Sequence, residues 1–179
     1  MDHFEGIVAT LLKAEGYWVA SSYKVHLSKE EKREIGKPSI PRPEIDLLAL
    51  SFSKNKILAI EAKSYLDSGG VPLAALQEVH EVPEGRYKLF TSKRYREIVF
   101  KRMREQLIEN GMANVDTVIE LGLAAGNVCG NDHEKIKLFM LQKNWHYWSP
   151  FDIKNKVREL ASLGYENDAA IITAKILSY

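Results

Sequence analysis

"PRPEIDLLALSFSKNKILAIEAKSY", residues 41–65, decides the fold because it places charged residues inside an almost continuous apolar run. Residues 45–52 and 56–65 each favour a strand, and the short SKNK segment between them favours a hairpin turn. Four charged residues lie along these strands: Glu44, Asp46, Glu61 and Lys63. A buried charge is costly unless it is paired or binds a metal. One end of this hairpin is therefore a candidate functional site.

The strand period predicts which of these charges meet. Side chains alternate between the two faces of a strand, so Glu61 and Lys63 share a face. A hairpin also places Asp46 beside Glu61. Two carboxylates and an ammonium suit divalent-metal phosphodiester hydrolysis, since Mg²⁺ prefers hard oxygen ligands and an ammonium can orient the nucleophile. The alternative is an edge hairpin in which Glu61 and Lys63 form a weak surface pair.

The bulk composition favours one ordinary globular domain. The chain has 179 residues, 45% of them hydrophobic, and a formal net charge of +1. A chain of this length can bury a core without disulfides, and the single Cys129 cannot form one internally. No apolar run is long enough for a membrane span, and the acidic start of the sequence does not resemble a signal peptide. We therefore expect a cytoplasmic protein that does not enter the membrane.

Periodicity predicts an α/β protein with a mixed sheet flanked by helices. Helices are expected from Phe4 to about Gly16 and over residues 73–81 and 92–111, with two more after residue 149 that are separated by a turn at Gly164. Strands are expected over residues 17–27, 45–52, 56–65, 87–91, 116–125 and 135–148. In residues 28–43, Ser28 with Glu31 could cap a short helical turn, and the three prolines that follow are expected to impose an irregular, exposed loop.

The hairpin residues resemble the PD-(D/E)XK nuclease superfamily, which includes restriction endonucleases, Holliday-junction resolvases and repair nucleases. Asp46, in the sequence EID, matches the metal-binding aspartate of this superfamily, and Glu61-Ala62-Lys63 matches its Glu-x-Lys motif. The strict Pro-Asp pair is absent, because Pro43 stands three residues before Asp46. The resemblance covers roughly the first half of the chain and implies a restriction-endonuclease-like αβββαβ core.

The resemblance also implies roles for individual residues. Asp46 and Glu61 would bind Mg²⁺ or Mn²⁺, and Lys63 would position the attacking water. Glu5 in the first helix matches a glutamate that joins the metal site in many resolvase-like members, although its distance from Asp2 is also that of a helix-capping box. Gln77 falls where some members place a polar active-site residue; it fits a surface amide equally well.

The implied function is a Mg²⁺-dependent DNA endonuclease of the resolvase or repair type. Two alternatives stay open: a sequence-specific type II restriction endonuclease, and a non-catalytic nuclease-like scaffold that binds nucleic acid or protein. Residues 1–148 would form the nuclease-like domain, and residues 149–179 a C-terminal helical hairpin packed on the same domain. This hairpin could contact a protein partner, and relatives of this kind commonly act as homodimers.

A basic segment suggests where DNA would lie. Residues 86–104 contain eight Lys or Arg and one Glu, a local charge of +7. Such a patch can follow a phosphate backbone, but it can also be an ordinary solvated helix face. The residues expected to contact DNA are Lys93, Arg94, Arg96, Lys101, Arg102 and Arg104.

Overall fold

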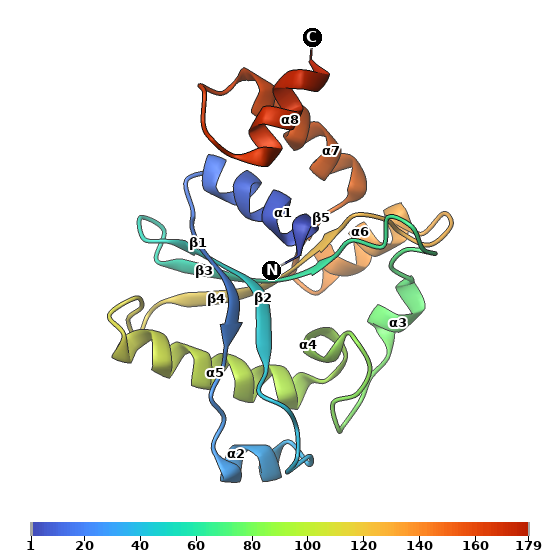
Figure 1. Cartoon of the computed structure of the whole chain (residues 1–179). Helices are drawn as coiled ribbons and strands as arrows, with labels where there is room; N and C mark the ends of the chain where they lie inside the picture. Colours follow the sequence, from blue (N-terminus) through green and yellow to red (C-terminus); the bar gives the residue numbers. More distant parts are fainter. Residues whose placement is uncertain (1, 179) are drawn as a thin grey trace.

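In the computed structural model, which describes residues 2–178, helices cover both faces of one five-stranded sheet (Figure 1). The sheet order is β1-β2-β3-β4-β5; β1, β2 and β3 are antiparallel neighbours, and β4 and β5 run parallel to β3. The strands are β1 (Trp18–Lys24), β2 (Glu44–Ser51), β3 (Lys56–Lys63), β4 (Val118–Ala125) and β5 (His146–Trp148). The predicted α/β class with a mixed sheet is confirmed.

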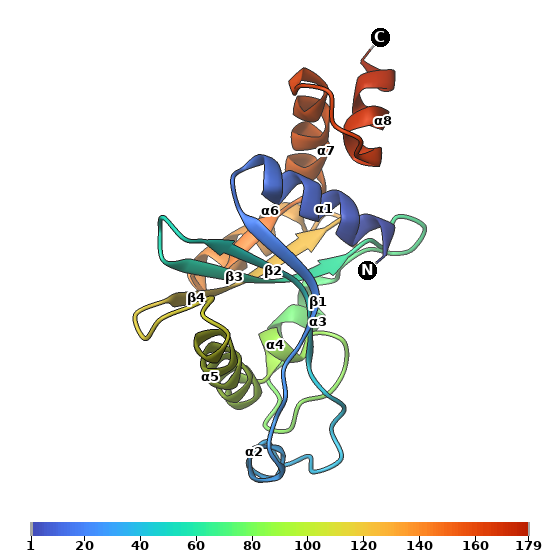
Figure 2. The ribbon, with the colours of Figure 1, turned by 60° about the vertical axis from the view of Figure 1, so that its left-hand side comes forward.

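The helices are shorter and more numerous than the sequence pattern predicts. They are α1 (His3–Ala14), α2 (Lys29–Glu34), α3 (Leu73–Gln77), α4 (Lys88–Thr91), α5 (Lys93–Glu109), α6 (His133–Gln142), α7 (Pro150–Glu159) and α8 (Ala169–Leu177), with a 3₁₀ turn at Leu160–Ser162. Figure 2 shows α1, α7 and α8 on one side of the sheet and α4 and α5 on the other. None of the helices in the described part of the chain has the length and apolar character needed to cross a lipid bilayer.

The alternating side chains of β2 and β3 contribute to two apolar clusters, one on each face of the sheet. Leu48 and Leu50 pack toward the α5 side, whereas Leu47 and Ala49 pack toward α1. The cluster on the α1 side also contains residues of the C-terminal helices, namely Ile153, Leu160, Ile171 and Ala174. Burial of these side chains holds the C-terminal helices on α1.

A side-chain contact reinforces this packing. Thr10 Oγ1 in α1 donates a 2.8 Å hydrogen bond to Asp168 Oδ2. The other carboxylate oxygen of Asp168 caps α8 by accepting the N–H groups of Ala170 and Ile171. One residue therefore both begins α8 and ties it to α1.

Two predicted strands are wrong. Within residues 87–91, Lys88–Thr91 form the short helix α4, and Thr91 donates both its N–H and its hydroxyl to the carbonyl of the N-cap residue Tyr87. Residues 135–148 form α6 followed by the short strand β5, with a turn at Asn144, where φ is +55°. Ile136 and Met140 are four residues apart and both are buried, which is the spacing of one helix face. The helix predicted over residues 73–81 is also shorter, since it ends at Gln77.

Candidate active site

The hairpin register brings Asp46 and Glu61 together, as predicted. Leu47 pairs with Ile60, so the next position on each strand places these two carboxylates side by side. Here the Asp46 carboxylate, instead of a backbone carbonyl, accepts the Ala62 N–H at 2.8 Å. This bond fixes the orientation of Asp46 at the point where regular strand pairing stops.

The neighbouring strand is also irregular beside Asp46. In the β1–β2 ladder, Ser21 pairs with Leu47 and Tyr23 pairs with Ile45, so Ser22 lies between these pairs. Ser22 has φ +53°, a left-handed conformation that is uncommon for a residue other than glycine. Regular strand pairing is therefore interrupted beside Asp46 on the β1 side and ends beside it on the β3 side, and backbone strain of the kind seen at Ser22 is common at functional sites.

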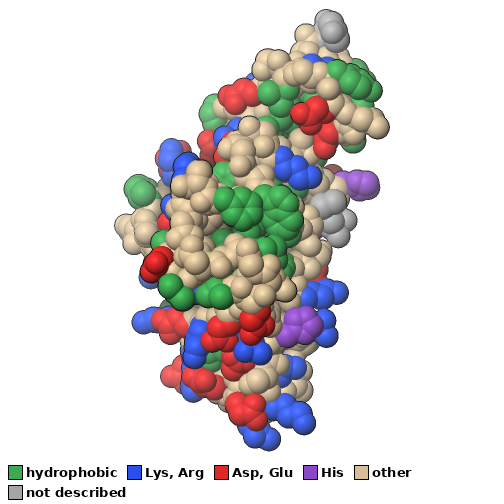
Figure 3. All heavy atoms as spheres, turned by 90° about the vertical axis from the view of Figure 1, so that its left-hand side faces the viewer, with side chains coloured by type: hydrophobic (Ala, Val, Ile, Leu, Met, Phe, Trp, Pro, Cys, Tyr) green, Lys and Arg blue, Asp and Glu red, His purple; other side chains and the backbone are tan. Residues whose placement is uncertain are grey.

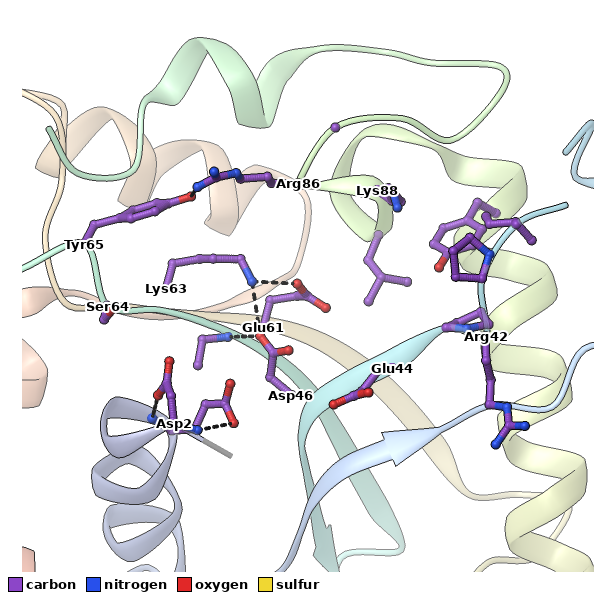
Figure 4. A pocket seen from close by; sticks show the side chains of 18 residues that line it. Asp2, Arg42, Glu44, Asp46, Glu61, Lys63, Ser64, Tyr65, Arg86 and Lys88 are labelled. Atoms are coloured by element: carbon purple, nitrogen blue, oxygen red, sulfur yellow. Dashed lines mark hydrogen bonds and ion pairs between the residues drawn. The ribbon is translucent and has the colours of Figure 1, made fainter. Parts of the chain in front are cut away.

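Lys63 links the two carboxylates at one end of the sheet (Figure 4). Its Nζ lies 3.1 Å from Asp46 Oδ2 and 3.0 Å from Glu61 Oε2. The three side chains are only 12–21% exposed, and β3 is an inner strand between β2 and β4. The alternative of a solvent-facing edge hairpin is thus wrong: these charges lie within the fold and are paired.

Burial and proximity shift the protonation of the cluster. Burial raises the pKa of Glu61 to about 7; Asp46 also raises it, and Lys63 partly offsets both. Burial lowers the pKa of Lys63, but the carboxylates of Glu61 and Asp46 outweigh this effect, so its pKa lies above the ordinary value. Lys63 is consequently an ammonium at neutral pH and acts as a hydrogen-bond donor, not as a base.

Glu5 has both of the features expected from the sequence. Its N–H donates to Asp2 Oδ1 at 2.8 Å and its carboxylate accepts the Asp2 N–H at 3.2 Å, which completes a capping box for α1. Glu5 also lines the pocket that contains Asp46 and Glu61, and burial, followed by the charge of Asp46, raises its pKa. Within residues 2–178, however, no three His, Cys, Asp or Glu side chains are grouped closely enough to hold a metal.

The carboxylates and Lys63 lie in an open pocket of about 470 Å³ between the start of α1, the start of β2, the end of β3, residues of α4 and α5, and three loop segments. Its wall includes three basic residues, Arg42, Arg86 and Lys88, and two phenols, Tyr65 and Tyr95. Sequence reasoning did not place any of these five residues in the site. The only indications were that Arg42 belongs to the proline-rich loop, that Tyr65 ends the second strand of the predicted hairpin, and that the other three belong to the basic segment.

The basic residues of α5 lie mostly away from this pocket. Arg96 Nη1 donates to the Leu89 carbonyl at 2.7 Å, and its guanidinium lies over the Trp145 ring. Arg102 Nε donates to the His26 carbonyl at 3.1 Å. Both residues therefore connect parts of the protein to one another.

The remaining α5 cations show different degrees of exposure. Lys93, Arg94 and Lys101 are exposed, whereas Arg104 is half-buried. On the face shown in Figure 3, acidic and basic side chains are intermixed over the half of the molecule that contains α2. The local charge of +7 thus does not produce a uniformly basic surface on that face.

Gln77 is exposed at the end of α3 and is not among the residues that line the pocket. Its position suits a surface amide. Glu44, by contrast, lies at the pocket rim, where its carboxylate is 3.9 Å from the Lys24 ammonium.

Comparison with known proteins assigns no family to this chain. The sequence matches no known family model and no curated protein. Among solved structures, the chain is similar to the crystal structure of a protein of unknown function, AF1548, with 12% sequence identity and a TM-score of 0.38. The match covers 96% of this chain and 64% of AF1548, so the chain spans less than two thirds of that protein's length.

Proposed function

We propose that this protein is a Mg²⁺-dependent DNA endonuclease with a restriction-endonuclease-like core, of the resolvase or repair type. The observation that carries the proposal is the convergence of Asp46 and Glu61, from neighbouring strands, on the ammonium of Lys63 in an open pocket. Structural charges are usually either paired in the protein interior or exposed to water. Here they are paired and also accessible to a ligand.

The order of the elements supports the same proposal. The chain runs from α1 into three antiparallel strands and returns through α5 to β4, which is parallel to β3. Apart from the short helices α2, α3 and α4, this is the αβββαβ order that the sequence resemblance implies. Asp46 lies on the second strand and the Glu-x-Lys residues end the third.

The residues present fit a divalent cation. Asp46 and Glu61 offer hard carboxylate oxygens that already face one positive charge, and Glu5 lines the same pocket as a further candidate. A bound Mg²⁺ or Mn²⁺ would lower the pKa of a coordinated water and screen the phosphate charge. Lys63, as an ammonium, would donate a hydrogen bond that orients the attacking water or stabilises the developing negative charge.

Cleavage assays with Mg²⁺ or Mn²⁺ would test this function on branched, single-stranded and linear duplex DNA. Wild type should cut at least one of them, and Lys63→Ala should lower the rate by roughly 100-fold or more, the scale of losing one transition-state donor. Lys137→Ala, an exposed lysine on α6, is the matched control. A preference for branched DNA would favour a resolvase, and cutting at one sequence would favour a restriction enzyme.

One observation favours a second candidate, a non-catalytic scaffold. The C-terminal helices and the loop between them expose several large apolar side chains, including Tyr165 at 80% and Leu177 at 79%. Surfaces of this kind can bind other proteins. Failure of the wild type to cut any of the DNA substrates with either metal would contradict the endonuclease proposal and favour this one.

A further inference from the structure

Tyr65, two residues beyond Lys63, has an unusual backbone conformation. Its φ is +43°, a left-handed value that is an outlier for a bulky side chain. Its carbonyl accepts hydrogen bonds from Asn127 Nδ2 and from the Ser68 N–H, each at 3.2 Å. These contacts keep a costly conformation that a free loop would avoid, and such strain clusters at functional sites.

Gly126, the residue after β4, packs closely against the backbone of Lys63 and Ser64. Gly126 donates its N–H to the Lys63 carbonyl at 2.8 Å. A Cβ on Gly126 would lie 2.4 Å from the Ser64 carbonyl oxygen, so only glycine allows this approach. The path from Lys63 to Tyr65 is therefore set by contacts with residues about 60 positions away in the sequence.

This path directs the Tyr65 phenol into the pocket, where it meets Arg86. Arg86 Nη1 donates to Tyr65 Oη at 3.3 Å. In Figure 4 the pair lies on the opposite side of Lys63 from α1. Because arginine has only donors, the phenol oxygen is the acceptor in this pair, and its own hydrogen remains available to a ligand.

The charge on this side of the pocket is positive. Arg86 and Lys88 line this side, and Arg42 lines the pocket farther away, near Glu44 (Figure 4). None of the three has a carboxylate within 4.0 Å among the described residues. The carboxylates, by contrast, are engaged by Lys63 or by the cap of α1, apart from Glu44 at the rim, which lies 3.9 Å from the Lys24 ammonium. A wall of unpaired cations and hydrogen-bond donors fits an anion that offers only acceptors.

We propose that Tyr65 and Arg86 together bind a backbone phosphate of the nucleic-acid strand next to the phosphate that is hydrolysed. This inference rests on the proposed endonuclease function. Guanidinium and phenol groups commonly donate hydrogen bonds to phosphate oxygens, and an arginine can contact two phosphate oxygens at once. The strained backbone of Tyr65 would then position the phosphate site, since the hydrogen bond to its phenol holds the Arg86 guanidinium at a fixed place relative to Lys63.

Binding measured without cleavage tests this site. Fluorescence anisotropy of a labelled single-stranded oligonucleotide in EDTA would give affinity as a function of salt. Arg86→Gln should weaken binding about tenfold at low salt and reduce the log–log salt slope by about 0.7, the value for one phosphate contact on a single strand. Tyr65→Phe keeps the ring and should weaken binding about 3- to 10-fold, the scale of one hydrogen bond.

Lys137→Gln removes the same charge from an exposed site on α6 and should change neither quantity. The proposal is overturned if wild type binds no oligonucleotide, if Arg86→Gln behaves as wild type, or if Lys137→Gln has an equal effect. Unchanged binding by Tyr65→Phe would show that the hydroxyl makes no phosphate contact, which also overturns the paired site.

The failures of the two proposals can be told apart. If wild type cuts DNA with Mg²⁺ but Arg86→Gln binds normally, the endonuclease stands and the phosphate site fails. If no DNA is cut with either metal but Arg86→Gln still loses one phosphate contact, the phosphate site stands without the endonuclease. Far-ultraviolet circular dichroism of each variant would check that the fold is intact, which we expect for Arg86→Gln because Arg86 is exposed.

Discussion

Replacing Glu61 by glutamine should make the metal-free protein more stable at alkaline pH. Glutamine has nearly the shape of a protonated glutamate, so the variant removes the ionised carboxylate and little else. Burial raises the pKa of Glu61 from 4.5 to about 7, which means that ionisation is less favourable in the folded chain than in the unfolded chain. Above pH 7 the wild type carries that whole cost, and Glu61→Gln does not.

The pH range follows from the sign of this shift. Between pH 4.5 and about 7 the folded chain binds more protons at Glu61 than the unfolded chain, so the wild-type free energy of unfolding falls as pH rises. At about 1.4 kcal/mol per pH unit, the full shift corresponds to at most roughly 3.4 kcal/mol. Because Lys63 shares the interaction, we expect a gain of about 1–3 kcal/mol at pH 8. Below pH 4.5 the gain should vanish.

Urea unfolding in EDTA at pH 4, 6 and 8 would measure this gain, with the exposed Glu159→Gln as the matched control. For a chain of this size each kcal/mol moves the melting temperature by about 2–4 °C, so thermal unfolding offers a second readout. Equal or lower stability of Glu61→Gln at pH 8 would refute the reasoning, because the Lys63 contact would then outweigh burial. Added Mg²⁺ should stabilise the wild type more than the variant if Glu61 is a ligand.

Three further substitutions test the surrounding structure. Ser22→Val should lower the free energy of unfolding by about 1–2 kcal/mol in urea titrations, because a β-branched residue fits poorly at φ +53° even though valine favours strands. Gly126→Ala should cost about 1–3 kcal/mol, measured in the same way, because its methyl group would collide with the Ser64 carbonyl; a neutral result would show that this approach is not tight. Burial raises the pKa of Glu120, but hydrogen bonds from Lys56 and His146 outweigh this and lower it. Glu120→Gln should therefore cost about 1 kcal/mol at pH 7 and progressively less as the pH falls below 4.5, as comparison of urea midpoints would show.

The sequence predicted the fold well where periodicity is local and strong. The hairpin of β2 and β3, the helix α5 and the two C-terminal helices lie close to their expected positions. The errors at residues 87–91 and 135–148 have one cause: in both places a short apolar run suits a strand and a buried helical turn equally. In α6 the spacing of Ile136 and Met140 matters only because the sheet face beneath them is apolar, which is tertiary information.

The same distinction separates the two halves of the candidate site. Asp46, Glu61 and Lys63 could be grouped from the sequence because a two-residue period and one short turn determine their relative positions. Arg42, Arg86 and Tyr65 could not, since they lie in the pocket only through loop conformations that distant contacts impose. Asn127, for example, holds the Tyr65 carbonyl across 62 positions. No local pattern encodes such a contact.

The burial of the carboxylates follows from this construction. Asp46 is oriented by the Ala62 N–H and Glu61 by the strand face, so both are held in place before any ligand binds. The energy that raises the pKa of Glu61 is a cost in the free protein, and a bound divalent cation would remove much of it by favouring the ionised form. Strain at Ser22 and Tyr65 lies beside the same residues. A site that concentrates strain and unfavourable charge where strand pairing stops is better explained by ligand binding than by stability.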